Sequence, residues 1–284
     1  MSQPWDVVLA TTDPLPEPDP CEAPLLAALT RLGLRATSWP WRDPSLDWGQ
    51  TRAVILRATW DYPWHLEAFR DWLERVDGVT KLLNPMTSLR WNLHKRYLLE
   101  LREAGVPCVP TYVAPKGCEQ SLEEIVVTRG WDDVVVKPAE GAGSFETYVM
   151  PALSRDEARF KALVAQRDLL VQPYIATVES VAERAMVFIA GEFSHAMHKE
   201  PRFTGQEEKV SGPHPVTDAE LKVAKAALAA VPGSTSYARV DLFRGEDGSP
   251  IVSEVELLEP SLFLCAHPPA ADALAAHLQA HLAA

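Results

Sequence analysis

Short apolar segments alternate with polar and proline-rich stretches at the start of the chain. Residues 5–11 and 53–56 are mostly apolar runs of the length typical of buried strands, and residues 23–32 have helical spacing. A further amphipathic helix is expected over residues 64–76. This strand-helix-strand order predicts a small α/β layer with a parallel sheet over residues 1–90.

The middle of the chain combines helical and strand-like patterns. A helix is expected over residues 92–104, because a glycine and then prolines follow it directly. Two strand-like runs, 134–137 and 147–150, flank the glycine-containing loop 139–146. The pattern predicts a β-loop-β unit.

Two capping boxes, each a hydroxyl residue followed three positions later by glutamate, mark further helix starts. Ser154 with Glu157 predicts a helix to about residue 166, and Thr217 with Glu220 predicts one to about residue 230. Residues 200–215 are polar and aperiodic, which predicts a mobile loop. The remaining expected elements are a strand at 169–172, a hairpin of 184–190 and 193–197, an antiparallel pair of 237–243 and 250–258, and a closing helix from residue 270.

Composition indicates an ordinary globular protein with an acidic surface. The 284 residues are 47% hydrophobic and carry a formal charge of −12, which repels nucleic acid and anionic membranes, so neither is an expected partner. The start of the chain lacks the regions of a secretory signal, no stretch suits a bilayer span, and we expect a cytoplasmic location. The four cysteines lack metal-ligand spacing and predict neither a zinc site nor a disulfide framework: Cys21, Cys108, Cys118 and Cys265.

Charged residues recur on the antiparallel pair near the C-terminus. Because side chains alternate along a strand, Arg239 and Asp241 share one face of the first strand, and Glu254 and Glu256 share one face of the second. A turn centred near Asp247 brings the three carboxylates to one cavity. Three like charges repel unless a cation joins them, and all-oxygen ligation favours magnesium or manganese. A solvated acidic face is the alternative, which the apolar neighbours disfavour.

Basic residues beside glycines suit phosphate binding. Lys137 ends an apolar run before the loop 141–144, where Gly141, Gly143 and Ser144 allow backbone amides to approach phosphate oxygens. No Walker A pattern is present, and a plain hairpin loop is the alternative.

Three more basic residues are candidates for the same role. Lys95 lies on the expected helix 92–104, and Lys199 and Arg202 border the polar loop. Ordinary surface charge is the alternative reading of each.

Polar and aromatic residues follow the strand at 53–56. Open α/β sheets place ligands at such strand ends, so five residues are substrate-side candidates: Arg57, Thr59, Trp60, Asp61 and Tyr62. Arg57 suits a carboxylate and Asp61 an ammonium group. A strand-end ion pair with a packing tryptophan is the alternative.

The order of these features resembles the ATP-grasp ligases of the glutathione synthetase and D-alanine:D-alanine ligase type, with a closer likeness to cyclo-ligases of the D-cycloserine synthetase kind. The resemblance covers nearly the whole chain, and its last two segments are the specific ones. The segments that carry it are Arg57-Ala-Thr-Trp-Asp-Tyr62, Asn84-Pro85, Arg90-Trp-Asn-Leu-His-Lys-Arg-Tyr97, Val135-Val-Lys-Pro138, Gly141-Ala-Gly-Ser144, Leu170-Val-Gln-Pro-Tyr-Ile175, Gly191-Glu-Phe-Ser-His195, Arg239-Val-Asp241 and Glu254-Val-Glu-Leu-Leu-Glu-Pro-Ser261.

The resemblance implies an α/β and α+β fold, with an N-terminal α/β substrate-side domain at 1–90 and ATP between two α+β subdomains at 91–175 and 176–284. The implied roles are Lys95 and Lys137 on the phosphates, Gly141 to Ser144 covering them, Gln172, Tyr174 and Ile175 at adenine, Glu179 or Glu183 at ribose, Lys199 at the terminal phosphate, Asp241, Glu254 and Glu256 on magnesium, and Arg239 at the transition state. Many relatives differ at three places, with asparagine at Glu256, an acid at His94 and Gln-Glu at Gln172-Pro173.

The implied activity joins a small-molecule carboxylate to an amine through an acyl phosphate, releasing ADP and phosphate. The cyclo-ligase likeness indicates an amino-acid-like substrate. Two alternatives stay open, an ATP-grasp kinase acting on a small molecule and a nucleotide-binding protein without turnover. The sequence also leaves open whether ligation is intramolecular, and whether the protein is a homo-oligomer.

Overall fold

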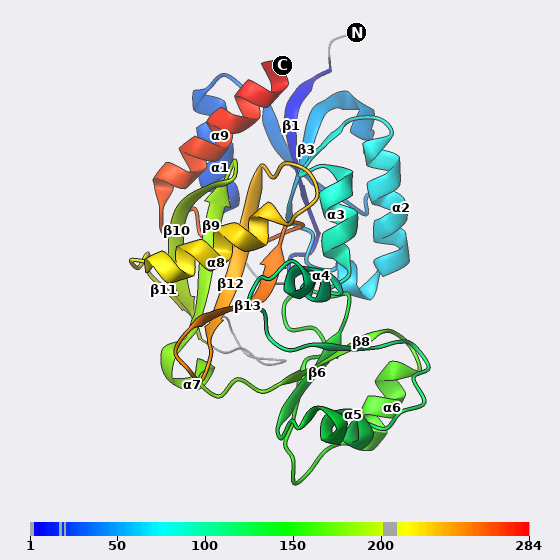
Figure 1. Cartoon of the computed structure of the whole chain (residues 1–284). Coiled ribbons are helices and arrows are strands. Elements are labelled where there is room, and N and C mark those ends of the chain that lie inside the picture. Colours follow the sequence, from blue (N-terminus) through cyan, green and yellow to red (C-terminus); the bar gives the residue numbers. More distant parts are fainter. Residues whose placement is uncertain (1–2, 17–18, 20, 201–208, 284) are drawn as a thin grey trace.

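The computed structural model describes residues 3–16, 19, 21–200 and 209–283 (Figure 1). The described strands form three sheets, and each sheet lies within one of the three predicted segments. The segment boundaries themselves stay a prediction. Within the described ranges, no helix combines the length and apolar character needed to cross a membrane.

The N-terminal sheet is parallel, as predicted, with the order β2-β1-β3-β4. Its strands are β1 (Trp5–Thr11), β2 (Ala36–Pro40), β3 (Thr51–Ala58) and β4 (Lys81–Leu83), and its helices are α1 (Glu22–Arg31), α2 (Leu66–Asp77) and α3 (Met86–Leu93), with 3₁₀ turns at Trp48–Gln50 and Tyr62–Trp64.

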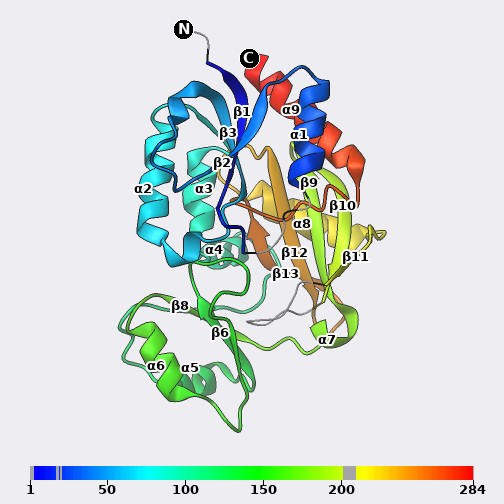
Figure 2. The same cartoon turned by 180° about the vertical axis from the view of Figure 1, so that it is seen from behind.

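Helices cover both faces of this sheet (Figures 1 and 2). Val7 and Leu9 of β1 belong to a core shared with α1 and the C-terminal helix α9 (Pro268–Ala283), whereas Val8 and Ala10 belong to a core shared with α2 and α3. Because both faces are buried, the two central strands β1 and β3 contain continuous apolar runs in the sequence.

The middle sheet has the order β5-β8-β6-β7 and is antiparallel. Its strands are β5 (Tyr112–Ala114), β6 (Val134–Pro138), β7 (Tyr148–Met150) and β8 (Leu169–Pro173), and its helices are α5 (Leu122–Arg129) and α6 (Glu157–Val164). Residues of both helices and of the sheet share one apolar core.

The C-terminal sheet is antiparallel, with the order β11-β10-β9-β12-β13. Its strands are β9 (Glu183–Ile189), β10 (Glu192–Lys199), β11 (Val210–Ser211), β12 (Tyr237–Arg244) and β13 (Pro250–Glu256), and nearby helices are α4 (Tyr97–Glu103), α7 (Val178–Val181) and α8 (Asp218–Ala229). The predicted hairpin and antiparallel pair are confirmed, and Asp241 is directly opposite Glu254. The capping box of Thr217 and Glu220 is also confirmed.

Two local predictions are wrong. Residues 92–104 do not form one helix, since α3 ends at Leu93 and α4 begins at Tyr97. Ser154 does not cap α6; the Asp156 side chain accepts a hydrogen bond from the Arg159 backbone amide instead. The Glu157 carboxylate does not complete the expected capping box, because it accepts a hydrogen bond from the backbone amide of Leu122 at 2.9 Å.

The polar segment 200–215 is partly described. Val210–Ser211 pairs with the end of β10 and so forms a short strand that the pattern did not predict. The expected loop at 201–208, and with it Arg202, lies outside the described residues.

Candidate active site

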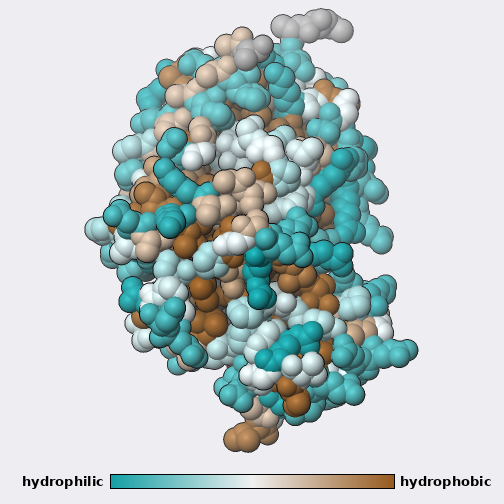
Figure 3. All heavy atoms as spheres, in the orientation of Figure 1, coloured by the Kyte–Doolittle hydropathy of each residue, from teal (hydrophilic) through white to brown (hydrophobic). Residues whose placement is uncertain are grey.

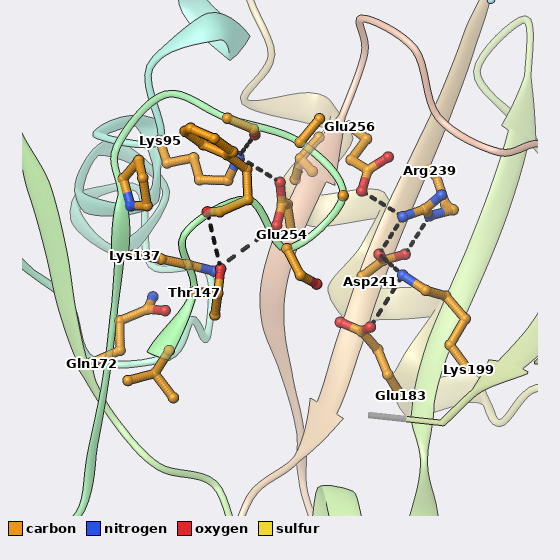
Figure 4. Close-up of a pocket in the computed structure, with 18 of the residues that line it drawn as sticks. Lys95, Lys137, Thr147, Gln172, Glu183, Lys199, Arg239, Asp241, Glu254 and Glu256 are labelled. Carbon is orange, nitrogen blue, oxygen red and sulfur yellow. Dashed lines mark hydrogen bonds and ion pairs between the residues drawn. The ribbon is translucent and has the colours of Figure 1, made fainter. Parts of the chain in front are cut away.

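A cavity of about 550 Å³ lies where the middle and C-terminal sheets meet the residues that follow β3 (Figure 4). Of the predicted site residues, those that line it are Trp60, Tyr62, Lys95, Lys137, Gly141, Gly143, Ser144, Gln172, Tyr174, Ile175, Glu183, Lys199, Arg239, Asp241, Glu254 and Glu256. Residues almost two hundred positions apart in the sequence therefore line one cavity, which is consistent with a single binding site.

Asp241 is the most deeply buried acid of this cavity, with 2% of its surface exposed. Its carboxylate accepts from Nε and Nη2 of Arg239, both at 2.8 Å, and from Nζ of Lys199 at 3.0 Å. Burial alone would raise the pKa of Asp241, but these two cations outweigh it and hold the pKa at about 2. Asp241 is thus ionised throughout the neutral range.

Glu254 faces two lysines from a different part of the chain. Its carboxylate lies 2.9 Å from Nζ of Lys95 and 3.9 Å from Nζ of Lys137. Burial opposes ionisation, yet the two ammonium groups lower the pKa of Glu254. Burial lowers the pKa of Lys137 despite this pairing, so phosphate oxygens would strengthen its charged form.

Lys199, at the end of β10, links two further acids. Its Nζ lies 3.0 Å from Asp241 and 3.2 Å from Glu183, and these contacts raise its pKa although burial and Arg239 act against it. Glu256 pairs with Nη2 of Arg239, but burial is the larger effect and raises the pKa of Glu256 to about 7. The acidic and basic side chains of this part of the cavity, here called the cavity floor, therefore pair with one another. They are Lys95, Lys137, Lys199, Arg239, Glu183, Asp241, Glu254 and Glu256.

The three predicted metal ligands meet at this floor without forming a closed cluster. Within the described residues, no group of three His, Cys, Asp or Glu side chains is arranged to hold a metal ion. The acids form ion pairs with Arg239, Lys95 and Lys199. The donor chemistry still fits magnesium, since Asp241, Glu254 and Glu256 all offer carboxylate oxygens to one cavity.

The glycine-containing loop covers the cavity from the middle sheet. Nζ of Lys95 donates to the Gly141 carbonyl at 2.5 Å, and the Phe145 ring meets the ring of Trp64 edge-on, with 4.9 Å between the centroids. Gly143 has a φ of 58°, and the non-glycine Ser144 and Glu146 also have positive φ, 60° and 47°. Positive φ is uncommon for residues other than glycine, so the conformation of this loop is held by its surroundings.

Apolar residues also line the cavity. They are Val109, Val135, Ile175, Val178 and Phe243. Nε2 of Gln172 donates to Oγ1 of Thr111 at 2.8 Å. The three residues for which the resemblance implies adenine contacts, Gln172, Tyr174 and Ile175, all line the cavity.

The two ribose candidates differ in position. Glu183 lines the cavity, whereas Glu179 is exposed, lies outside its lining and accepts from the Tyr174 hydroxyl at 2.5 Å. Of the two candidates, the geometry therefore favours Glu183 for a contact with ribose.

Three of the five substrate-side candidates lie outside the lining. Asp61 accepts from Nε1 of Trp41 at 2.6 Å and from Arg42 at 3.2 Å, so its carboxylate is already engaged. Thr59 is fully buried, and Arg57 is buried behind the cavity, where Nη1 donates to the Pro260 carbonyl at 3.0 Å. Only Trp60 and Tyr62 reach the cavity directly.

Several lining residues were not singled out from the sequence, among them Phe145, Phe243 and Glu259. The two phenylalanines are single apolar positions without a pattern. Glu259 stands in the quoted segment Glu254–Ser261, but only the fold shows that it lines the cavity.

The fold is that of the ATP-grasp ligases, and solved structures agree. An ATP-grasp ligase PsnB complexed with its minimal precursor has a TM-score of 0.66 and 19% identity over 96% of this chain and 99% of that chain. D-alanine–D-alanine ligase from Bacillus anthracis complexed with ATP has a TM-score of 0.66 and 13% identity over 98% and 97%. At these identities the likeness establishes the fold.

More similar relatives define the family. The model of the D-cycloserine synthetase DcsG N-terminal domain matches residues 7–84. The cycloserine biosynthesis protein DcsG of Streptomyces lavendulae is 34% identical over 262 residues, 85% of this chain and 87% of the relative. The crystal structure of D-cycloserine synthetase DcsG has a TM-score of 0.88 and 31% identity, covering 97% of this chain and 99% of that chain. The chain belongs to the DcsG family and is an ATP-dependent ligase.

Proposed function

We propose that the protein activates the carboxylate of an amino-acid-like substrate with ATP and then joins the activated carbon to a nitrogen. The observation that carries the proposal is the cavity floor, where four basic and four acidic side chains meet: Lys95, Lys137, Lys199, Arg239, Glu183, Asp241, Glu254 and Glu256. Phosphoryl transfer needs this combination, because negative charge moves from one oxygen to another during the reaction and positively charged groups must stabilise it at each position.

The proposed orientation of ATP follows from the two kinds of residue that line the cavity. The apolar residues, among them Ile175 and Phe243, would receive adenine, Glu183 would receive ribose, and Lys95 and Lys137 would receive the phosphates beneath the loop 141–144. Nζ of Lys137 lies 3.9 Å from Oε2 of Glu254, which is a long ion pair. A phosphate oxygen would therefore compete for a lysine that is only weakly paired.

Two bond exchanges make up the proposed reaction. A substrate carboxylate oxygen bonds to the γ-phosphorus while the bond to the bridging oxygen breaks, which releases ADP and gives an acyl phosphate. A nitrogen then bonds to the acyl carbon and loses a proton, and the carbon–oxygen bond to phosphate breaks. Lys199 and Arg239, which line the cavity beside Asp241, would stabilise the oxygen charge of both steps.

Asp241, Glu254 and Glu256 would hold magnesium, which when bound supplies positive charge beside the phosphate oxygens. The chain's own contribution is to place those carboxylates on adjacent strands, with Asp241 opposite Glu254, and to keep Asp241 ionised. The glycine-containing loop and the Trp64–Phe145 contact would shield the acyl phosphate from water.

The names of the relatives favour ring closure within one molecule. A D-cycloserine synthetase forms a small cyclic amino acid derivative, and the likeness to that protein covers 97% of this chain. We therefore extend the proposal to an amino-acid-like substrate whose own nitrogen attacks its activated carboxylate.

The test is a screen for ADP release with magnesium, ATP and a panel of amino acids and their O-substituted derivatives, followed by mass analysis of the products. The proposal expects phosphate release that depends on an amino-acid-like substrate and a product lighter by one water. A stable phosphorylated product would identify a kinase instead, and nucleotide binding without any turnover would identify a binding protein.

A further inference from the structure

Glu259 is a buried acid that the phosphate and metal chemistry does not use. It follows β13, lines the cavity and has 8% of its surface exposed. Its Oε2 atom is completely buried and has no hydrogen-bond partner in the described part of the chain. A buried carboxyl oxygen without a partner is unfavourable for folding, and in the lining of a cavity such an atom is a candidate ligand contact.

The backbone around Glu259 is fixed from the N-terminal sheet. Nε1 of Trp60 donates to the Glu259 carbonyl at 3.1 Å, and Nη1 of Arg57 donates to the carbonyl of Pro260 at 3.0 Å. These contacts engage main-chain oxygens and leave the carboxyl group itself to the cavity. Arg57, at the end of β3, and Trp60, just after it, therefore help to position Glu259.

The surroundings of this carboxyl group suit an organic cation. Trp60 and Tyr62 line the cavity beside it, and aromatic rings with a carboxylate are favourable for ammonium groups. Burial, and then the charges of Glu256 and Glu254, raise the pKa of Glu259 to about 8, although Lys95 acts against them. A cationic ligand would supply the positive charge that this position lacks.

We infer that Glu259 binds the α-ammonium group of the amino-acid substrate. This inference rests on the proposed function and names the group that the site recognises. Asp61, the acid expected from the sequence, cannot take this role because it is paired with Trp41 and Arg42. An amine held as ammonium has no lone pair, so Glu259 also keeps the α-nitrogen from attacking the acyl phosphate and leaves that step to another nitrogen.

Matched probes test the inference. D-cycloserine carries an amino group, and isoxazolidin-3-one is the same ring without it. Calorimetry with ADP and magnesium present, at a pH where the probe amine is protonated, should show D-cycloserine binding about tenfold or more tighter to the wild type than to Glu259→Gln. Isoxazolidin-3-one should bind both proteins equally weakly. Glu259→Asp should restore part of the difference, and Glu246→Gln, in an exposed turn, should match the wild type.

Unequal outcomes separate this inference from the proposed function. If Glu259→Gln binds ADP normally and D-cycloserine as tightly as the wild type does, or if the wild type does not distinguish the two rings, the inference is overturned. If the amino-group preference depends on Glu259 but no substrate yields ADP, the recognition site stands and the ligase reaction fails.

Discussion

Replacing Asp241 with asparagine removes a buried negative charge and keeps nearly the same side-chain shape. The pKa of Asp241 is about 2 rather than 3.8, a difference that corresponds to about 2 kcal/mol in favour of the ionised form. Arg239 retains Glu256, and Lys199 retains Glu183. The expected loss of stability is therefore about 2 kcal/mol, below the roughly 3–5 kcal/mol of a fully orphaned buried charge.

The loss of turnover in Asp241→Asn should be larger than the loss of folding stability. Asp241 is both a proposed magnesium ligand and the partner that orients Arg239 and Lys199, so turnover should fall at least about 100-fold. ADP release measures turnover, and thermal melting, which should drop by only a few degrees, measures the fold. Asp132→Asn, at an exposed position, is the matched control.

The magnesium assignment can be refuted with the same assays. Glu254→Gln should behave like Asp241→Asn, and both variants should lose the extra thermal stabilisation that magnesium gives together with ADP. Turnover retained in both variants would remove the metal assignment.

Two further predictions concern nucleotide binding and acid stability. Lys137→Ala should weaken ADP binding at least about tenfold by calorimetry, and unchanged affinity would count against a phosphate contact. Burial, and then His267, lower the pKa of His195 from 6.5 to about 4. The unfolded chain therefore binds a proton between these values while the folded chain does not, and stability falls as the pH falls through this range, by up to about 3 kcal/mol from this residue. Denaturant unfolding should show a shallower pH dependence for His195→Gln, and an unchanged slope would refute it.

The acidic hairpin could be predicted from the sequence because strand alternation is a local rule. Arg239 and Asp241 are two positions apart, as are Glu254 and Glu256, and the turn together with a register shift between Asp241 and Leu242 sets which of them face each other. The parallel N-terminal sheet follows from equally local evidence, since its two central strands, β1 and β3, contain continuous apolar runs. The second strand of that sheet, Ala36–Pro40, was not predicted because it is only half-buried and ends in proline.

Features set by distant contacts could not be predicted. The break between α3 and α4 arises where the Lys95 amide donates to the Ala139 carbonyl at 2.7 Å and its ammonium group reaches Glu254. No local pattern carries that information. For the same reason the sequence indicated Asp61 as the ammonium partner, since its pairing with Trp41 appears only in the fold.

Substrate oxygen labelling tests the central claim most directly. A carboxylate enriched in a heavy oxygen isotope is supplied with ATP and magnesium, and the released phosphate is analysed by mass. Activation as an acyl phosphate predicts that one substrate oxygen appears in each phosphate formed, in the wild type at full rate and in Asp241→Asn at a greatly reduced rate. Phosphate that contains only oxygen from ATP and water would contradict the account.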